Sequence, residues 1–310
     1  MWQRSVLLIL VLCVNVQCGQ ADEPFLIVLG VAQDGGVPQA GSQDHDQWRD
    51  PGRRRHVACL AIVDPRSAKR WMIDCTPDFP EQLHALDETA PPHEERPGLD
   101  GIFLTHGHMG HYTGLMYVGH EVMGSKGVPV YAMPRMHEFL STNAPWDQLV
   151  RYENIVLHSL EDGSPVELTS SLTVTPILVP HRQEYTEVVG YRIEGPRQSV
   201  LYIPDIDSWE EFDEAGGHIE SLIEGVDVAY LDATFFSDSE LPGRDMSGFP
   251  HPFITHSMKR FAPLPETERA KVRFIHLNHT NPALWAHTDA RKAIESAGFL
   301  VAEELERLDL

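Results

Sequence analysis

Short apolar segments recur along the chain, separated by turn residues or by longer amphipathic stretches. Phe25–Gly30, His56–Asp64 and Arg70–Cys75 are apolar and bounded by Gly, Asp or Pro, a pattern typical of buried strands. Gly101–Thr105 and Val128–Met133 predict two more strands of the same kind. The second half of the chain repeats the pattern in Leu172–Pro180, Val188–Gly195, Ser199–Asp205, Asp227–Thr234 and Val272–His279.

Amphipathic stretches with helical spacing lie between these strands. Thr76–Leu86 predicts a helix with Thr76 as N-cap and Pro77 in the first turn, where its missing N–H costs little. Further helices are expected within His111–Gly124, Pro134–Asn143, Gly216–Val226 and Phe253–Pro263. Two runs of mostly antiparallel strands, each interrupted by helices, indicate an α/β fold in which two sheets pack face to face with helices outside.

The first residues have the features of a secretory signal peptide. Arg4 precedes the apolar stretch Val6–Val16, and small residues follow at Gly19 and Ala21. This stretch is shorter than the roughly 20 apolar residues that span a bilayer. We therefore expect a cleaved leader at residues 1–21.

The remaining chain, residues 22–310, is expected to form one exported domain, periplasmic or secreted, with no stable membrane insertion. A lipid anchor at Cys18 is the less favoured alternative, because Gln17 is not the small residue that such a site prefers. Cys59 and Cys75 remain after cleavage, which is too few for a disulfide framework. Each lies in or beside an apolar run, which favours buried thiols over a single disulfide.

Composition narrows the class of partner. The 310 residues carry a formal charge of −22, with 42% hydrophobic and 23% charged residues. These fractions are those of a globular protein with a sizeable core. The negative charge is unfavourable for binding nucleic acid or anionic lipid, both of which favour a cationic surface. A small-molecule substrate is therefore expected, and nucleic acid is not.

Three histidines directly follow the strand predicted at Gly101–Thr105. The sequence LTHGHMGH contains His106, His108 and His111. Neutral imidazole is a good ligand for zinc and similar ions, whose sites need three or four donors within ~2.0–2.2 Å of the ion. A His-x-His pair at a strand end can turn both rings toward one point, and a histidine three residues on can reach an adjacent point. The motif therefore predicts a metal site.

Further donors recur at the ends of other predicted strands. Asp74, His181, Asp205 and His279 each lie at or just after the end of an apolar run. Strand ends are where rigid scaffolds place functional groups, so the repeated placement is more informative than any single residue. We expect these four residues to converge with the three histidines.

In this order, the set resembles the metallo-β-lactamase superfamily, whose pattern is a strand-end Asp, His-x-His-x-Asp-His, a lone His, an Asp and a last His. The branch concerned with pyrroloquinoline quinone biosynthesis is similar through Val28–Gln39, His111–Leu115, Leu231–Phe236 and His276–Pro282. The cysteine-rich metal knuckle of that branch is replaced here by Gly41–Asp50. The resemblance implies an αββα sandwich of two mixed sheets with helices on the outer faces.

The resemblance also implies a role for each donor. Imidazoles would supply most of the ligands of two metal positions. The first position would be formed by His106, His108 and His181, and the second would use His111 and His279. Asp205 would bridge them. Gly110 stands where the family's usual Asp donates to the second position, so we expect weaker binding there, with one tight ion and one loose or vacant position. The expected cofactor is one or two zinc ions, with iron or manganese as alternatives.

Four other polar residues are candidates for supporting roles, two of them at predicted strand ends. Asp34 and Asp232 are carboxylates that could replace the missing one, and His251 and His256 are candidate donors or general acids. For each of them, a supporting or capping role beside the ligands is at least as consistent with the sequence. Asp74 is expected just outside the ligands, where its carboxylate would receive the other N–H of a ligand histidine and fix its tautomer.

These features predict a metal-dependent hydrolase acting on an ester, lactone or phosphodiester of a small molecule. A bound ion lowers the pKa of its water from about 15.7 toward ~7, and Asp205 or Asp34 would orient that water or move its proton. Iron with oxygen chemistry, as the quinone-cofactor branch implies, is one alternative, since three histidines with a carboxylate also suit iron. A non-catalytic binding protein of the same fold is another.

Overall fold

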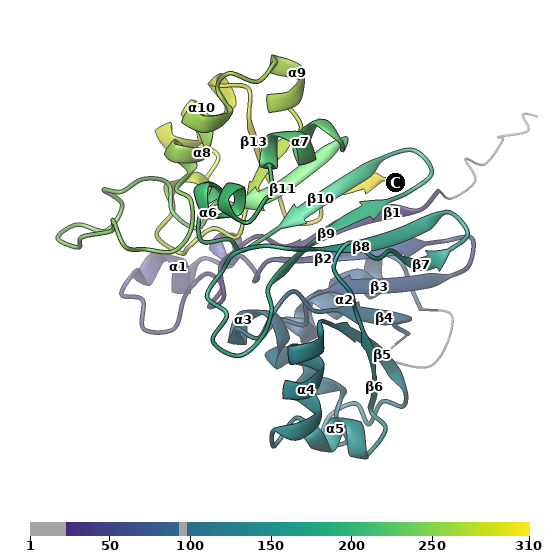
Figure 1. Ribbon diagram of the computed structural model, residues 1–310. Coiled ribbons are helices and arrows are strands. Elements are labelled where there is room, and N and C mark those ends of the chain that lie inside the picture. The colour runs from purple at the N-terminus through teal and green to yellow at the C-terminus, as the bar shows by residue number, and fades with distance from the viewer. Residues whose placement is uncertain (1–22, 93–97) are drawn as a thin grey trace, which may run out of the picture.

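The computed structural model describes residues 23–92 and 98–310. Two sheets of seven strands each pack face to face, with helices on their outer faces (Figure 1). This arrangement confirms the predicted αββα sandwich. The expected leader, residues 1–21, lies outside the described residues. Within the described ranges, no helix is long and apolar enough to cross a membrane.

The first sheet is built from the first half of the chain and the last strand. In spatial order its strands are β14 (Arg307–Asp309), β1 (Phe25–Gly30), β2 (Cys59–Asp64), β3 (Lys69–Ile73), β4 (Gly101–Phe103), β5 (Val128–Ala132) and β6 (Ile155–Ser159). Pairing is antiparallel from β14 to β3 and parallel from β3 to β6.

The second sheet repeats this division. In spatial order its strands are β13 (Leu300–Val301), β12 (Val272–Ile275), β11 (Val228–Asp232), β10 (Ser199–Ile203), β9 (Val189–Glu194), β8 (Leu172–Leu178) and β7 (Val166–Thr169). Pairing is antiparallel from β7 to β10 and parallel from β10 to β13. The expectation of mostly antiparallel strands is therefore wrong for half of each sheet, because crossover connections through helices make neighbouring strands parallel.

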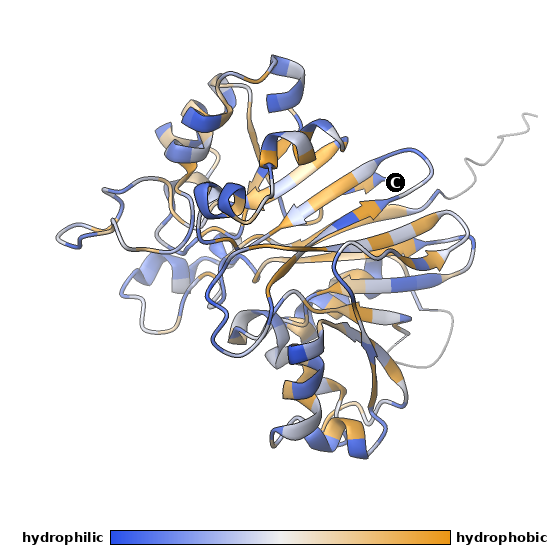
Figure 2. Cartoon of the chain, viewed as in Figure 1, coloured by the Kyte–Doolittle hydropathy of each residue, from blue (hydrophilic) through white to orange (hydrophobic). Residues whose placement is uncertain are grey.

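The main core lies between the two sheets. Leu26 and Val28 of β1 pack into it, whereas Phe25, Ile27 and Leu29 pack into a second core beneath the helices of the first sheet. All six residues of β1 are buried, because both faces of the strand are covered. This explains its continuous apolar sequence. Figure 2 shows hydrophobic residues along the strands and polar residues over the helices and loops.

Helices cover the outer faces of both sheets. Those of the first sheet are α2 (Phe79–Thr89), α3 (Met109–Tyr112), α4 (Pro134–Thr142) and α5 (Asp147–Arg151). Those of the second are α6 (Trp209–Glu214), α7 (Ile219–Glu224), α8 (Ile254–Phe261), α9 (Glu266–Arg269) and α10 (Asp289–Ser296). The short α1 (His45–Arg49) occupies the segment that replaces the cysteine-rich knuckle.

The helix expected from Thr76 begins later in the chain. α2 starts at Phe79, with Asp78 at its N-cap and Pro80 in its first turn. The hydroxyl oxygen of Thr76 accepts a hydrogen bond from the N–H of Asp78 at 3.1 Å, which closes a turn ahead of the helix. The sequence therefore identified the correct helix and the wrong capping residue.

The two cysteines of the described chain are core residues. Cys59 and Cys75 are both buried and free, so the alternative of a disulfide between them is wrong. Burial raises the pKa of both thiols well above the ordinary value. Buried thiols of this kind are inert, as the apolar sequence around them predicts.

An ion pair connects the segment before β2 to the turn before β14. Nδ1 of His56 lies 3.3 Å from Oε1 of Glu304, and the backbone N–H of His56 donates to the same carboxylate. The hydrogen bond to Glu304 raises the pKa of His56, against the opposing effect of partial burial. The folded-state pKa therefore lies above the unfolded value of about 6.5.

A histidine whose pKa is raised on folding stabilises the protein below its unfolded pKa, and this contribution is lost as the pH rises through the folded pKa. From about pH 6 to about pH 8, we expect the free energy of unfolding of the natural chain to fall by ~0.5–1 kcal/mol more than that of Glu304→Gln. Glutamine keeps an acceptor for the N–H of His56 but removes the charge. Urea unfolding at both pH values measures this, and equal pH dependence of the two proteins would refute it.

Candidate metal centre

The carboxyl ends of several strands meet at one edge of the sandwich. β3 and β4 are parallel in the first sheet, and β10, β11 and β12 are parallel in the second. Asp74, His106, Asp205 and His276 each follow one of these strands within three residues, and Asp232 ends β11. Because parallel neighbours end at the same edge of a sheet, the two sheets bring these five side chains together.

A short turn carries the histidine motif. The N–H of Gly114 donates to the carbonyl of Cys75 at 2.8 Å, and the N–H of Cys75 donates to the carbonyl of His111 at 2.9 Å. A Cβ on Gly114 would lie 2.2 Å from the carbonyl oxygen of Thr76, so only glycine allows this close approach. These bonds end the helical pattern early. The long helix predicted after the motif is wrong, because α3 passes directly into a 3-10 turn, Thr113–Val118.

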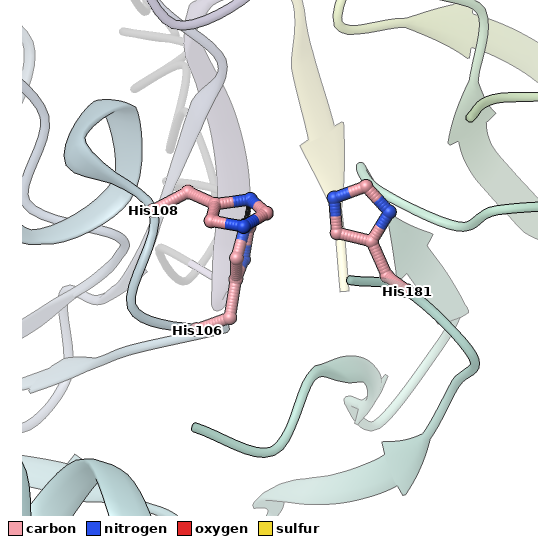
Figure 3. A group of neighbouring side chains, drawn as sticks. All are labelled: His106, His108 and His181. Carbon is pink, nitrogen blue, oxygen red and sulfur yellow. Dashed lines mark hydrogen bonds between the residues drawn. The ribbon is translucent and has the colours of Figure 1, made fainter. Parts of the chain in front are cut away.

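His106, His108 and His181 form the first group of donors. One nitrogen from each lies within 4.8 Å of the others. Figure 3 shows the rings of His106 and His108 on one side, facing that of His181 on the other. Nε2 of His106 is 2.9 Å from Nδ1 of His108. The structure thus brings together the three imidazoles that the resemblance assigned to one metal position.

Asp34, His111 and His276 form the second group, again with donor atoms within 4.8 Å of one another. Asp205 lies between the two groups. Its Oδ2 is 3.0 Å from Nε2 of His111 and 3.4 Å from Nε2 of His276. Its Oδ1 is 3.5 Å from Nε2 of His181. The two carboxylate oxygens therefore face different groups, which is the geometry of a bridging ligand.

Contacts on the far side of the rings fix their orientation. Nδ1 of His111 lies 2.7 Å from the buried carboxylate of Asp74, and Nδ1 of His276 lies 3.0 Å from the hydroxyl of Thr234. Asp207 contacts Nδ1 of His181 at 2.9 Å. Such contacts set the tautomer and direct Nε2 inward. Asp74 lies where the sequence analysis placed it, whereas Asp207 and Thr234 were missed.

Five inward atoms are buried and have no hydrogen-bond partner within the described part of the chain. They are Nε2 of His111, His181 and His276, Oδ2 of Asp205 and Oδ1 of Asp34. An unpaired buried polar atom costs about 1–3 kcal/mol. A divalent cation would satisfy imidazole nitrogens and carboxylate oxygens together, and mixed sets of this kind suit zinc and related ions. The residues present therefore fit a metal site.

Burial and carboxylate charge act on the imidazoles in opposite directions. Burial lowers the pKa of His106 well below its ordinary value. Burial also acts to lower the pKa of His111, but the carboxylates of Asp74 and Asp205 outweigh it and raise that pKa well above the ordinary value. His276 is affected in the same way, since Asp205 raises its pKa against the effect of burial. The carboxylates therefore draw positive charge into this space.

Three residues of the centre have a left-handed backbone. The φ angle is 69° at Asp74, 64° at His276 and 121° at His251. For residues other than glycine, such conformations cost of order 1–3 kcal/mol each and persist where surrounding structure enforces them. Strain at three positions of one cluster indicates that its geometry is imposed by the fold.

The structure does not bring His279 or His256 into the cluster. His276 occupies the position that the sequence analysis gave to His279, because it directly follows β12 as Asp74 directly follows β3. His279 lies three residues further on and lines a hollow beside the centre. His256 is on α8, exposed, with Nε2 3.8 Å from Asp238. The predicted strand Val272–His279 extends past the end of β12 at Ile275, which is why His276 was missed.

His251 lies at the rim of the centre and is paired with Asp232. Nδ1 of His251 is 2.7 Å from Oδ2 of Asp232 and 3.8 Å from Asp205. Asp232 is fully buried and accepts hydrogen bonds from the backbone N–H groups of Ile206 and Thr234, so its carboxylate is fixed. His251 also borders a hollow of about 780 Å³, so its ring lies between the metal centre and the space open to a ligand.

Comparison with known proteins finds relatives along nearly the whole chain. The family model described as "Beta-lactamase superfamily domain" matches residues 69–294. The Coenzyme PQQ synthesis protein B of Xanthomonas campestris pv. campestris (strain B100) is 27% identical over 305 residues, covering 90% of this chain and 97% of that protein. The protein of the same name from Nitrosococcus oceani is 26% identical, covering 89% of this chain and 96% of its own length.

Solved structures share the architecture. Zn(2+)-bound PqqB from Methylobacterium extorquens superimposes with a TM-score of 0.75 at 23% identity, over 92% of this chain and 100% of that chain. A diphosphatase from the PhnP family has a TM-score of 0.64 at 23% identity, over 92% and 96% respectively. The family match extends over most of the chain and agrees with the two packed sheets. The chain therefore belongs to the β-lactamase superfamily and has the metallo-β-lactamase fold.

Proposed function

We propose that the protein is a metal-dependent hydrolase of a small anionic molecule. The observation that carries the proposal is the pair of donor groups, one of three imidazoles and one of two imidazoles and a carboxylate. Asp205 lies between the two groups, and unpaired atoms are directed inward. The imidazoles His106, His108 and His181 would hold one ion. His111 and His276 would hold a second, with Asp205 shared between them. Zinc is the proposed ion because the donors are mainly imidazole, and the neighbour from Methylobacterium extorquens is zinc-bound.

The residues around the centre would move the protons of the reaction. When bound, such an ion lowers the pKa of a water toward ~7 and polarises the oxygen of the bond under attack. Asp205 would orient that water, since both of its oxygens face the donor groups. The carboxylate of Asp34, which is partly exposed and borders the hollow, would accept its proton. His251 would donate a proton to the leaving oxygen through Nε2. Asp232, 2.7 Å from Nδ1, would accept the hydrogen bond of that nitrogen and hold the orientation of the ring.

The hollow beside the centre favours an anionic substrate. Asp34 and His251 border it, and Arg182 and Arg244 line it as well. Arginine in such a position binds phosphate or carboxylate groups through paired N–H donors. In a chain with a formal charge of −22, two arginines beside a carboxylate-rich centre are well suited to bind an anion. Of ester, lactone and phosphodiester, we therefore favour the phosphodiester.

The protein purified without added metal is expected to contain one or two zinc ions per chain, and His106→Ala is expected to contain less, because it removes a donor from the first group. Elemental analysis measures both. His120→Ala is the matched control, since this imidazole is exposed and outside the centre. Iron, with oxygen consumed during turnover, would refute the hydrolase and favour an oxidoreductase. Absence of metal would favour a binding protein.

His251→Ala is expected to reduce kcat by about 10²–10⁴ on an alkyl phosphodiester and far less on bis(p-nitrophenyl) phosphate. The reason is that p-nitrophenolate leaves without a proton, whereas an alkoxide needs one. Steady-state kinetics on both compounds gives the ratio, and zinc content is measured in parallel. His256→Ala, exposed on α8, is the control. An equal loss on the two substrates would exclude His251 as the proton donor.

Arg182→Ala and Arg244→Ala are each expected to raise KM for a phosphodiester about tenfold or more, with a much smaller change for a neutral ester of similar size. The reason is that loss of a charge-assisted hydrogen bond weakens binding of the anionic substrate and not of the neutral one. Arg151→Ala, an exposed residue of α5, is the control. If KM rises equally for the charged and the neutral substrate, the two arginines do not recognise the anionic group.

A further inference from the structure

We propose that Asp34, in the turn after β1, supplies the carboxylate that the second metal position lacks at Gly110. The inference extends the proposed function, because it names a ligand of the same centre and rests on that centre binding metal. The family's usual carboxylate would come from the histidine turn itself. Here it would come from a segment of the chain more than seventy residues earlier.

Distances place the Asp34 carboxylate among the donors of the second group. Its Oδ1 is 3.2 Å from Nε2 of His111 and 3.6 Å from Nε2 of His276. The same two nitrogens lie 3.0 and 3.4 Å from Oδ2 of Asp205. Both imidazoles are fully buried. Oδ1 of Asp34 and both Nε2 atoms have no hydrogen-bond partner within the described ranges, so all of them remain available to a shared cation.

Gly110 is what leaves room for Asp34. A Cβ on Gly110 would lie 2.3 Å from Oδ1, 2.6 Å from Cα and 2.8 Å from Cβ of Asp34, all far inside van der Waals contact. Gly110 does not have a positive φ, so its conformation does not require glycine. The space that a side chain at residue 110 would fill is the space that Asp34 occupies. The two positions are therefore alternative sources of one carboxylate.

The turn that carries Asp34 is fixed to the segment that follows β12 and carries His276. The N–H of Gln33 donates to the carbonyl of Leu277 at 2.9 Å, and the N–H of Leu277 donates to the carbonyl of Val31 at 2.8 Å. These bonds lie directly before Asp34 on one segment and directly after His276 on the other. The backbone thus holds the carboxylate and the imidazole together, as a shared ligand set requires.

The test compares metal affinity in three variants with the natural chain. Asp34→Asn removes the charge at nearly constant shape. Gly110→Ala adds one methyl group that displaces Asp34 and removes no donor. Asp238→Asn, an exposed carboxylate outside the centre, is the control. Zinc stoichiometry and affinity are measured by competition with a chromogenic chelator, and the melting temperature of the metal-free proteins checks folding.

The natural chain and Asp238→Asn are expected to bind two zinc ions. Asp34→Asn and Gly110→Ala are expected to keep the first ion and to bind the second at least roughly tenfold more weakly. Unchanged affinity for both ions in Asp34→Asn would overturn the inference, even if Gly110→Ala fails to fold. A natural chain that binds a single ion would also overturn it, while leaving a one-metal hydrolase possible. A chain that binds no zinc would overturn the proposed function itself.

Discussion

The centre is governed by one constraint, which is that polar atoms buried by the fold must be paired. The imidazoles of His111 and His276 each make a contact on the outer side of the ring and none of hydrogen-bond geometry on the inner side. A shared cation would satisfy these inner atoms together with Asp205. Without a cation, the carboxylates raise the pKa of both rings, so they favour protonation. Metal binding at this centre would therefore displace protons, and affinity would rise with pH.

The packing of the apolar core also determines the geometry of the centre, because each sheet carries only some of the donors. The histidine motif belongs to the first sheet, whereas His181, Asp205 and His276 belong to the second. The hydroxyl of Tyr191 on β9 donates to the carbonyl of Leu104, just before the motif. The N–H of Val189 on the same strand donates to the carbonyl of Thr105 at 3.1 Å. These bonds tie the two sheets together beside the ligands, so the packing of the sandwich sets the distances across the centre.

The strands and the pairing of His106 with His108 as candidate donors could be predicted from the sequence because their signals are local. A strand buried on both faces is apolar throughout, and His106 and His108 are two residues apart on one turn. The direction of strand pairing could not be predicted, because it depends on which strands become neighbours. The choice between His276 and His279 failed for a related reason. β12 ends where its pairing with β11 ends, at Asp232 opposite Ile275, and the sequence does not show that end.

Asp207 and Asp34 show a second limit of the sequence. Asp205 and Asp207 follow the same strand two residues apart, and only the fold shows that one faces the centre while the other supports His181 from outside. Gly110 was interpreted as the loss of a carboxylate, with Asp34 and Asp232 as candidates to replace it, and the sequence could not decide between them. In the structure, the space beside Gly110 is occupied by Asp34, which comes from another segment of the chain. The negative charge at a metal centre depends on every segment that reaches the site, whereas a motif shows only the residues of one segment.

The source of that charge also affects how the centre meets its ligand. Asp34 has a side chain that is 43% exposed, whereas His111 and His276 are fully buried. Asp34 also lines the hollow that Arg182 and Arg244 border. A carboxylate placed there has one side toward the second metal position and the other toward the entering molecule. Under the proposed function, occupation of the hollow and occupation of the second metal position would then be coupled through a single side chain, because each changes the charge that Asp34 experiences.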